Sequence, residues 1–321
     1  MEIKETQLGE QTLITVNNGI LKLTLSTFGA SLYSVIFNNE EMLLTPKRVE
    51  DFLTDNYYGK TIGRINNRVE GGLLMVEGRS YYLPKNEDDN TYNSGSEGLH
   101  KENFSYRIES NNLETKIIFS FLSREDRSSL PGDVYLNVTY LVKENDNKFT
   151  IKLDALSNKD TILGFSNHIF FSLGSHGLED KKLQIKASKF IHTKRENLVP
   201  LYVVDVPSCI NYLEEKPVLF DINNLFLQDH AAYGLNHNYV FDNVSLRKDN
   251  LIFENSKYTL KLYTDFECVH ISSCNYPDGI EKVTGENSRY EGLLIEAEEN
   301  IKDRRVSKEF HHQTIYSFEK K

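Results

Sequence analysis

Two ionisable side chains interrupt apolar stretches of the sequence and could transfer protons. His168 lies in GFSNHIFFSLGS, after an asparagine and before aromatic residues, and Glu296 lies in the middle of GLLIEAEEN. Near neutral pH a glutamate is ionised and accepts a proton, whereas a histidine can donate one. A positioned acid or base of this kind contributes roughly 10²–10⁴-fold to a rate. The pair predicts general acid–base chemistry if both side chains face one pocket.

Two further polar stretches could hold a substrate. GKTIGRINNRVEGG places Arg64 and Arg68 between glycines, and GSEGLHKENF places His100 after a Gly-Leu pair. Arginine and histidine present donors that can grip hydroxyl groups. Each residue also has a structural interpretation: surface ion pairs for the arginines, a loop position for His100. In the same way, His168 could be a core residue and Glu296 a charge at a strand edge.

Other kinds of catalytic or ligand-binding motif are absent from the sequence. There is no nucleophile elbow, phosphate-binding loop or dinucleotide fingerprint. The three cysteines, Cys209, Cys268 and Cys274, show neither CxxC spacing nor a nearby histidine pair. The sequence therefore predicts reduced thiols in a cytoplasmic protein, with no metal site.

Charge and hydropathy exclude two classes of partner. The 321 residues carry a net charge of −10, whereas binding nucleic acid needs a basic surface. The N-terminal stretch MEIKETQLGEQ lacks the apolar region of a signal peptide, and no stretch approaches 18 consecutive apolar residues. We therefore expect a cytoplasmic protein that contacts neither nucleic acid nor membrane.

Alternating apolar and polar residues predict strands along most of the chain. The leucines of GILKLTLSTFG alternate with polar residues. In DVYLNVTYLVKENDNKFTIKLDAL two alternating runs flank ENDN, which predicts a hairpin with Phe149, Ile151 and Leu153 on one face. One further strand each is expected in KIIFSFLS, KLQIKASKFI, KYTLKLYTDF and YEGLLIEAEE. The pattern indicates an all-β fold, a large antiparallel β-sandwich forming a single domain over residues 1–321. Two stacked β domains are the alternative.

The order and wording of the polar stretches resemble the aldose 1-epimerase (galactose mutarotase) family. IGRINNRVEGG is similar to that family's GRxxNRI, GLHKENF to its LHGG…GF, and SNHIFFSLG to its TNHSYFNL. Further along, GLNHNYVFD resembles DHNFVL and LLIEAEEN resembles LETQ. LPGDVYLNVTYLV and the tail FHHQTIYSFEKK also have counterparts, so the resemblance covers nearly the whole chain.

The resemblance implies a galactose mutarotase-like supersandwich with the site in a groove of one sheet. It also implies reversible interconversion of the α and β anomers of a free aldose, without metal or cofactor. Glu296 would be the general base and His168 the general acid. Arg68, His100 and Asn67 would line the sugar site.

The sequence departs from the family pattern at four places. LHGG has become LHKE, which introduces Lys101 and Glu102 beside His100. The aspartate before HN in the sugar site is Asn236, and an expected glutamine is His270. NIKD replaces the PDAxN segment after the proposed base. These changes leave the proposed acid and base intact but alter sugar recognition, so the preferred sugar need not be galactose.

Two other functions fit the same fold. One is the epimerisation of hexose 6-phosphates, for which Lys60 or Lys101 could bind the phosphate. The other is a non-catalytic carbohydrate-binding module, since a fold does not fix a function. Retention of both Glu296 and His168 argues against the binding module, because a lectin has no use for an acid and a base.

Overall fold

Antiparallel strands dominate the computed structural model, which describes residues 1–228 and 233–321. The leucine-rich stretch forms β3 (Leu21–Ser26), and the expected hairpin forms β13 (Val134–Lys143) and β14 (Lys148–Ile162). Phe149, Ile151 and Leu153 are each 1% exposed. Side chains two residues apart on a strand share a face, so one side of this hairpin faces the core as predicted. The all-β, antiparallel class is confirmed.

The largest sheet in the described residues has nine strands. Their spatial order is β11–β12–β13–β14–β26–β23–β22–β17–β20, and every neighbouring pair is antiparallel. The strands not yet located are β11 (Ser105–Ser110), β12 (Glu114–Ser123), β17 (Lys182–Ile185), β20 (Lys216–Pro217), β22 (Leu251–Glu254), β23 (Tyr258–Thr264) and β26 (Val306–Lys320). The last strand of the chain thus lies inside the sheet.

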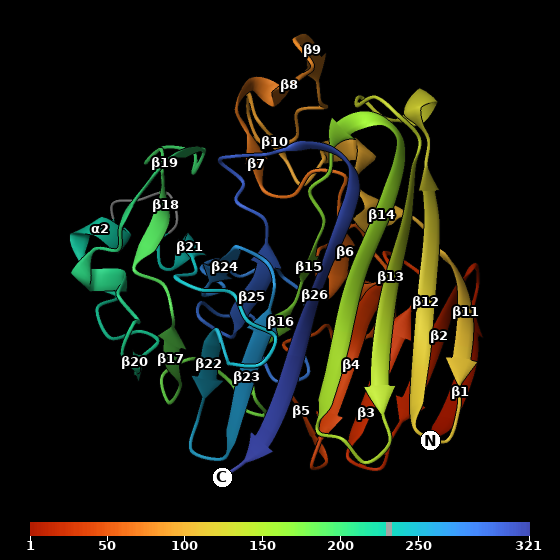
Figure 1. Ribbon diagram of the computed structural model, residues 1–321. Helices are drawn as coiled ribbons and strands as arrows, with labels where there is room; N and C mark the ends of the chain where they lie inside the picture. The colour runs from red at the N-terminus through yellow and green to blue at the C-terminus, as the bar shows by residue number, and fades with distance from the viewer. Residues whose placement is uncertain (229–232) are drawn as a thin grey trace.

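A five-stranded sheet covers part of this large sheet and completes a sandwich. With β3 in its middle, it contains β1 (Glu2–Leu8), β2 (Gln11–Asn17), β4 (Ser31–Phe37) and β5 (Glu40–Glu41). In Figure 1 its red strands lie behind β11–β14. Ile14 and Leu23 from this sheet belong to the same buried cluster as Ile117 and Val138 from the large sheet. Burial of this apolar surface drives the two sheets together.

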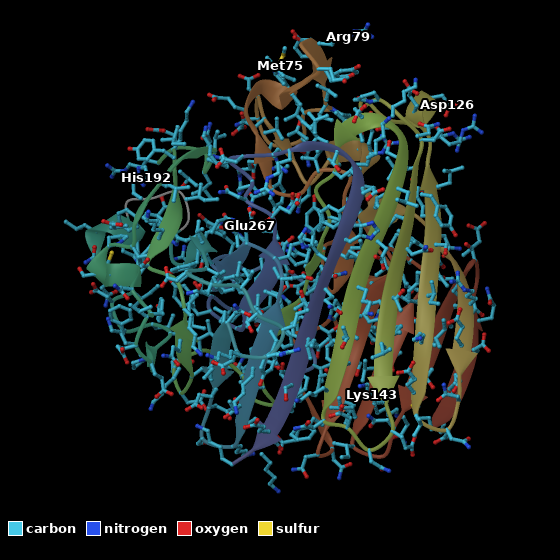
Figure 2. All side chains as sticks on the ribbon, in the orientation of Figure 1. Met75, Arg79, Asp126, Lys143, His192 and Glu267 are labelled. Atoms are coloured by element: carbon cyan, nitrogen blue, oxygen red, sulfur yellow. The ribbon has the colours of Figure 1, made fainter. Side chains whose placement is uncertain are left out.

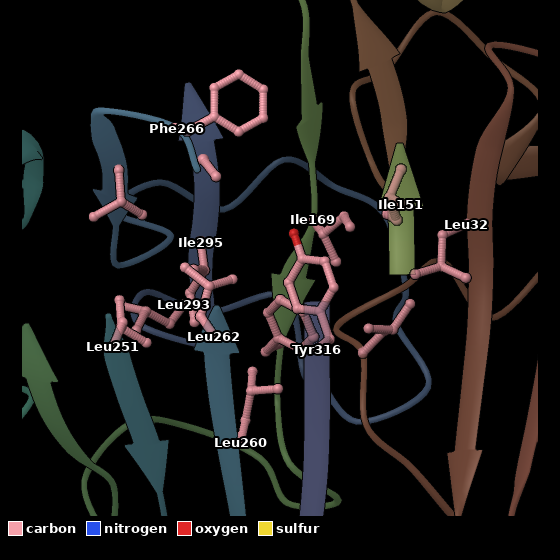
Figure 3. Packing of buried hydrophobic residues seen from close by; sticks show 14 of the residues in the cluster. Leu32, Ile151, Ile169, Leu251, Leu260, Leu262, Phe266, Leu293, Ile295 and Tyr316 are labelled. Atoms are coloured by element: carbon pink, nitrogen blue, oxygen red, sulfur yellow. The ribbon is translucent and has the colours of Figure 1, made fainter. Parts of the chain in front are cut away.

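A six-stranded sheet carries three of the polar residues singled out in the sequence, Asn236, His270 and Glu296. Its order is β16 (Phe170–Phe171), β25 (Leu293–Glu298), β24 (Cys268–Ser272), β21 (Asn236–Val240), β18 (Lys189–Thr193) and β19 (Pro200–Asp205). Leu293 and Ile295 of β25 join the same core cluster as Leu251 and Leu262 of the large sheet (Figure 3). The alternate residues of β25 therefore point to its other face.

Short elements connect the sheets. They are α1 (Val49–Phe52), α2 (Leu225–Gln228), β6 (Lys60–Ile62) paired with β15 (Ser166–His168), β7 (Arg68–Val69) paired with β10 (Thr91–Tyr92), β8 (Leu73–Val76) paired with β9 (Arg79–Tyr82), and five 3₁₀ turns in the described residues, at Glu70–Gly72, Gly95–Glu97, Leu99–Lys101, Glu125–Arg127 and Ser208–Ile210. Figure 2 shows Met75 and Arg79 at the end of the molecule opposite to Lys143. Among the described residues, no helix is long and apolar enough to cross a membrane.

One predicted strand is wrong in its extent. KLQIKASKFI was expected to form a single strand, but it forms β17 and β18, which belong to different sheets. Between them the backbone N–H of Ala187 donates to the carbonyl of Ile185, and that of Lys186 donates to the carbonyl of Asn250. The chain passes here from the nine-stranded to the six-stranded sheet. The alternation of Leu183, Ile185 and Ala187 shifts by one residue at the adjacent polar pair Ser188–Lys189, which is the local signal of this crossing.

Candidate active site

Three neighbouring strands of the six-stranded sheet place polar residues in one row. In the register of β21, β24 and β25, Asn238 lies opposite His270, and His270 lies opposite Glu296. Directly opposed residues of antiparallel strands point to the same face. All three are at most 5% exposed. The row therefore brings a carboxyl, an imidazole and an amide together on the face of β25 that points away from Leu293 and Ile295.

Glu296 and His168 are in direct contact. Nδ1 of His168 lies 2.6 Å from Oε2 of Glu296, and the hydroxyl of Ser166 donates to Oε1. Burial is the largest influence on the pKa of Glu296 and raises it, but the electrostatic attraction and hydrogen bond of His168, with those of His270 and Ser166, outweigh burial and lower the pKa below its usual value. Glu296 is therefore a carboxylate at neutral pH, able to accept a proton.

His168 also lines a cavity of about 430 Å³. Tyr57, Tyr58, Phe170 and Ser272 form part of the same wall. Because Nδ1 of His168 faces Glu296, the ring nitrogen left for a ligand is Nε2. The cavity falls within the usual size range of small-molecule sites, about 300–1,000 Å³. A hydroxyl group of a ligand in this cavity could thus contact Nε2 of His168, while the carboxylate of Glu296 fixes the orientation of the imidazole.

A second buried carboxyl, Glu298, lies two residues beyond Glu296 on the same face of β25. The side-chain amides of Asn66, Asn67 and Asn238 all donate to it. The oxygen of Asn66 accepts from Nη1 of Arg304 at 3.0 Å, which turns its NH₂ group toward Glu298. Burial raises the pKa of Glu298 well above its usual value, and the nearby charge of Glu296 adds to the effect. These hydrogen bonds attach Asn66 and Asn67 to β25.

His270 is held as a neutral imidazole. Its Nδ1 lies 2.9 Å from Oδ1 of Asn238, and burial lowers its pKa to about 3. Glu296 opposes that change, while His168 and Arg68 add to it electrostatically. His270 therefore takes part in the site as an uncharged group that can donate or accept hydrogen bonds.

Arg68 is fixed at the edge of the site by a carboxylate and an aromatic ring. Its Nε and Nη2 lie 2.5 and 2.7 Å from the two carboxylate oxygens of Glu87, and its guanidinium stacks over Tyr92 at 4.6 Å. Such a two-point ion pair orients the planar guanidinium. Arg68 directly follows Asn67, whose side-chain amide lies 3.4 Å from Oδ1 of Asn238 in the row.

Asn67 turns its side chain into the buried cluster. Its amide nitrogen lies 3.4 Å from both Glu298 Oε1 and Asn238 Oδ1, and its own oxygen accepts from the backbone N–H of Arg68 at 2.9 Å. The residue is 6% exposed. In this arrangement Asn67 connects the loop before β7 to the polar row.

His100 lies beneath an acidic side chain. It is 1% exposed, and its Nε2 lies 2.9 Å from Oδ1 of Asp55. Nζ of Lys101 lies 2.9 Å from the other oxygen of Asp55. The ring of Tyr57 packs 4.5 Å from that of His100. Burial lowers the pKa of His100 to about 4, so the imidazole is neutral at pH 7.

Asn236 lies one step along the sheet from the polar row. It is opposite Ser272, which lines the cavity, and two residues before Asn238 on the same strand. Its side chain is half-buried, and its backbone N–H donates to Nδ1 of His237 at 3.0 Å. Asn236 is therefore on the same face as the row and beside the cavity wall.

The structure brings His168 and Glu296 into contact and gathers Asn67, Arg68 and Asn236 around them. His100 is connected to this group indirectly. Its ring packs against Tyr57, whose ring is 5.6 Å from that of His168, and its Nε2 contacts Asp55 of the cavity wall. Sequence reasoning missed Ser166, Asn238, Glu298 and Asp55. The alternating IEAE of β25 contained a signal for Glu298, since a second acidic residue follows Glu296 at a spacing of two.

The donor set of the site suits protons and hydroxyl groups. Among the residues that the structure describes, no group of three or more His, Cys, Asp or Glu side chains is arranged to hold a metal ion. The carboxyl and imidazole groups of the row are instead paired with each other or with amides.

Comparisons with known proteins identify the family of the chain. The family model described as Aldose 1-epimerase matches residues 12–302. The galactose mutarotase of Mus musculus is 25% identical over 282 residues, which cover 82% of this chain and 79% of that protein. The aldose 1-epimerase of Streptococcus thermophilus is 31% identical over 179 residues, covering 53% of this chain and 50% of the relative.

Solved structures show the same fold. A galactose 1-epimerase from Lactobacillus acidophilus superposes with a TM-score of 0.87 at 21% identity, covering 99% of this chain and 98% of that one. A GalM/aldose epimerase homologue from C. elegans gives 0.83 at 21% identity, covering 97% of this chain and 99% of that one. With a family match over nearly its whole length, the chain belongs to the aldose 1-epimerase family.

Proposed function

We propose that this chain interconverts the α and β anomers of a free aldose, with Glu296 as general base and His168 as general acid. The observation that carries the proposal is the 2.6 Å contact between His168 Nδ1 and Glu296 Oε2 beside a cavity that His168 lines. Family membership supports the reaction class. The residue roles rest on the geometry of this chain.

The reaction needs two proton transfers at neighbouring oxygens. Glu296 takes the proton of the C1 hydroxyl, His168 gives a proton to the ring oxygen, the bond between C1 and the ring oxygen breaks, and C1 becomes an aldehyde. Rotation about C1–C2 then exposes either face. Reclosure returns one proton to His168 and one from Glu296 to O1, so protons balance and no covalent intermediate with the protein forms.

The state of each group suits its task. The lowered pKa of Glu296 keeps it ionised and ready to accept a proton. With Nδ1–H of His168 directed to that carboxylate, a protonated imidazole presents its second proton from Nε2 to the cavity. Ser166 fixes Oε1 of Glu296, which keeps the carboxylate plane constant as the sugar approaches.

The alternative substrate, a hexose 6-phosphate, gains no support from the two lysines considered for it. The ammonium of Lys60 is fully buried and donates to the carbonyl of Thr54, and burial lowers its pKa to about 7. The ammonium of Lys101 is paired with Asp55. Binding a phosphate dianion needs positive charge that is not already compensated.

Polarimetry tests the proposed function. Freshly dissolved α-galactose and α-glucose should reach rotational equilibrium faster with the protein than without it, in proportion to protein concentration. Activity that appears only with 6-phosphorylated sugars and falls steeply with added salt would favour the phosphate epimerase. Sugar binding without any acceleration would favour a carbohydrate-binding module.

A further inference from the structure

Asp55 holds a prepared carboxylate at the wall of the cavity. It lies between α1 and β6 and lines the same cavity as His168. Oδ1 is 2.9 Å from Nε2 of His100, and Oδ2 is 2.9 Å from Nζ of Lys101. Two anchors from one 3₁₀ turn thus fix both oxygens of the carboxylate.

The carboxylate keeps capacity for further hydrogen bonds. An ionised carboxylate offers about four lone-pair sites, and the two anchors occupy two of them. The side chain of Asp55 remains 63% exposed. Although burial alone raises its pKa, hydrogen bonds from Lys101 and His100 outweigh burial and lower the pKa below its usual value. Two acceptor sites therefore remain open on a charged, immobilised group.

The other carboxylates that line the cavity are engaged elsewhere. Asp278 accepts from the hydroxyl of Tyr58 at 2.6 Å and pairs with Lys282. Glu291 lies 3.2 Å from the same lysine and is only 3% exposed. Among the described acidic residues of this cavity, Asp55 is the most accessible to a ligand.

His100 does not reach the cavity past Asp55. It is 1% exposed, and its Nδ1 is buried without a hydrogen-bond partner among the described residues. Since the imidazole is neutral, its proton lies on Nε2, where it donates to Asp55. A sugar entering the cavity therefore meets the carboxylate of Asp55 before it meets the ring.

We propose that Asp55 is a sugar-binding residue, whose carboxylate accepts hydrogen bonds from hydroxyl groups of an aldose that has its C1 at His168 and Glu296. His100 and Lys101 are its positioning residues. The proposal rests on the proposed function and names the group that supplies a charged acceptor in a site where Asn236 is neutral. Charge-assisted hydrogen bonds are about twice as strong as neutral ones.

The variant Asp55→Asn tests this proposal, because it keeps the shape of the side chain and removes its charge. In saturation polarimetry with α-galactose and α-glucose we expect KM to rise roughly tenfold, as for the loss of one hydrogen bond to a charged group, while kcat changes less than twofold. Lys101→Met leaves the acceptor but removes one anchor, so we expect a smaller rise in KM. Glu102→Gln changes the exposed neighbour of Lys101 and serves as the matched control, with unchanged constants.

Two results overturn the proposal. An unchanged KM in Asp55→Asn would show that Asp55 does not bind the sugar. A lowered KM would show that Asp55 obstructs the access of sugars to His100. Failure of the proposed function is distinguishable, because it appears as absence of turnover in the unsubstituted protein. In that event, calorimetric titration of galactose into the unsubstituted protein and Asp55→Asn decides: weaker binding by the variant supports Asp55 as a ligand, and equal or absent binding by both excludes it.

Discussion

Glu298 lies two residues beyond Glu296 on the same buried face of β25, yet their pKa values move in opposite directions. Burial raises both, but Glu296 contacts an imidazole, whereas the groups that donate to Glu298 are neutral amides. Electrostatic attraction to His168 thus gives Glu296 a lower pKa than Glu298, although the two carboxyls are similarly buried. A pair of titratable groups whose environments separate their pKa values is typical of acid–base sites.

Replacing Glu296 by glutamine should remove the proton acceptor while keeping the shape of the side chain. We expect the catalysed anomerisation rate to fall by about 10²-fold or more, because a positioned base contributes that much. The melting temperature should change little. Polarimetry with fresh α-anomers measures the rate, and Glu109→Gln on the exposed side of β11 is the control. Near-normal turnover in Glu296→Gln would exclude Glu296 from the chemistry.

The change His168→Asn separates a catalytic from a purely structural histidine. We expect ring opening to slow by roughly 10²-fold or more, the contribution of a general acid, while sugar binding stays measurable by calorimetry. A core histidine gives the reverse pattern, since losing its buried hydrogen bond costs stability first. Normal activity in a destabilised protein would therefore show that the role of His168 is structural and not catalytic.

Asn236→Asp should strengthen binding of the common hexoses. The side chain lies on the face of the polar row beside Ser272 of the cavity wall, and an aspartate there adds a charged acceptor for hydroxyl groups. We expect KM for galactose and glucose to fall by roughly threefold to tenfold, which corresponds to about 1 kcal/mol. If the unsubstituted enzyme already saturates at sub-millimolar galactose and the variant is no better, this position does not set specificity.

His312 makes stability depend on pH. It lies 3.2 Å from Asp265 and 3.3 Å from Glu299; burial lowers its pKa, but these carboxylates outweigh burial and raise it to about 9. A histidine with a raised folded-state pKa binds more protons folded than unfolded, so its stabilisation is complete below pH 6.5 and is lost as the pH rises through 9.

His312→Asn should remove this loss. Between pH 6.5 and pH 9, we expect the unfolding free energy of the unsubstituted protein to fall by on the order of 2 kcal/mol more than that of the variant. Urea titrations at both pH values measure it. His311→Asn, at an exposed neighbouring position, is the control and should keep the full pH dependence. Parallel pH profiles for His312→Asn and the unsubstituted protein would contradict the assignment.

Local sequence patterns were sufficient for strands that stay in one sheet. The alternation around Phe149 predicts β14 and its buried face, and the apolar residues around Glu296 predict β25. The division of KLQIKASKFI into β17 and β18 was missed, because the shift in alternation at Ser188–Lys189 spans only two residues and resembles an irregularity within one strand. Which sheet a strand joins depends on distant partners that a local pattern does not contain.

In the site, too, residues with a local signal could be predicted, whereas residues whose role depends on distant partners could not. His168 and Glu296 stand out because ionisable residues are costly in apolar strands. Asp55 gives no such signal, since it lies in a polar loop and gains its role only through contact with His100, 45 positions later in the chain. Similarly, nothing local to Arg68 indicates that Glu87 would take up its guanidinium.

The place of β26 in the nine-stranded sheet sets the order in which the fold can be completed. This strand is synthesised after the other strands of the sheet, yet it pairs with β14 on one side and β23 on the other. Until it emerges from the ribosome, β14 and β23 each present an edge of unpaired backbone groups, the kind of edge on which other chains pair and aggregate. The nascent protein therefore depends on Val306–Lys320 to close its own sheet before another molecule does.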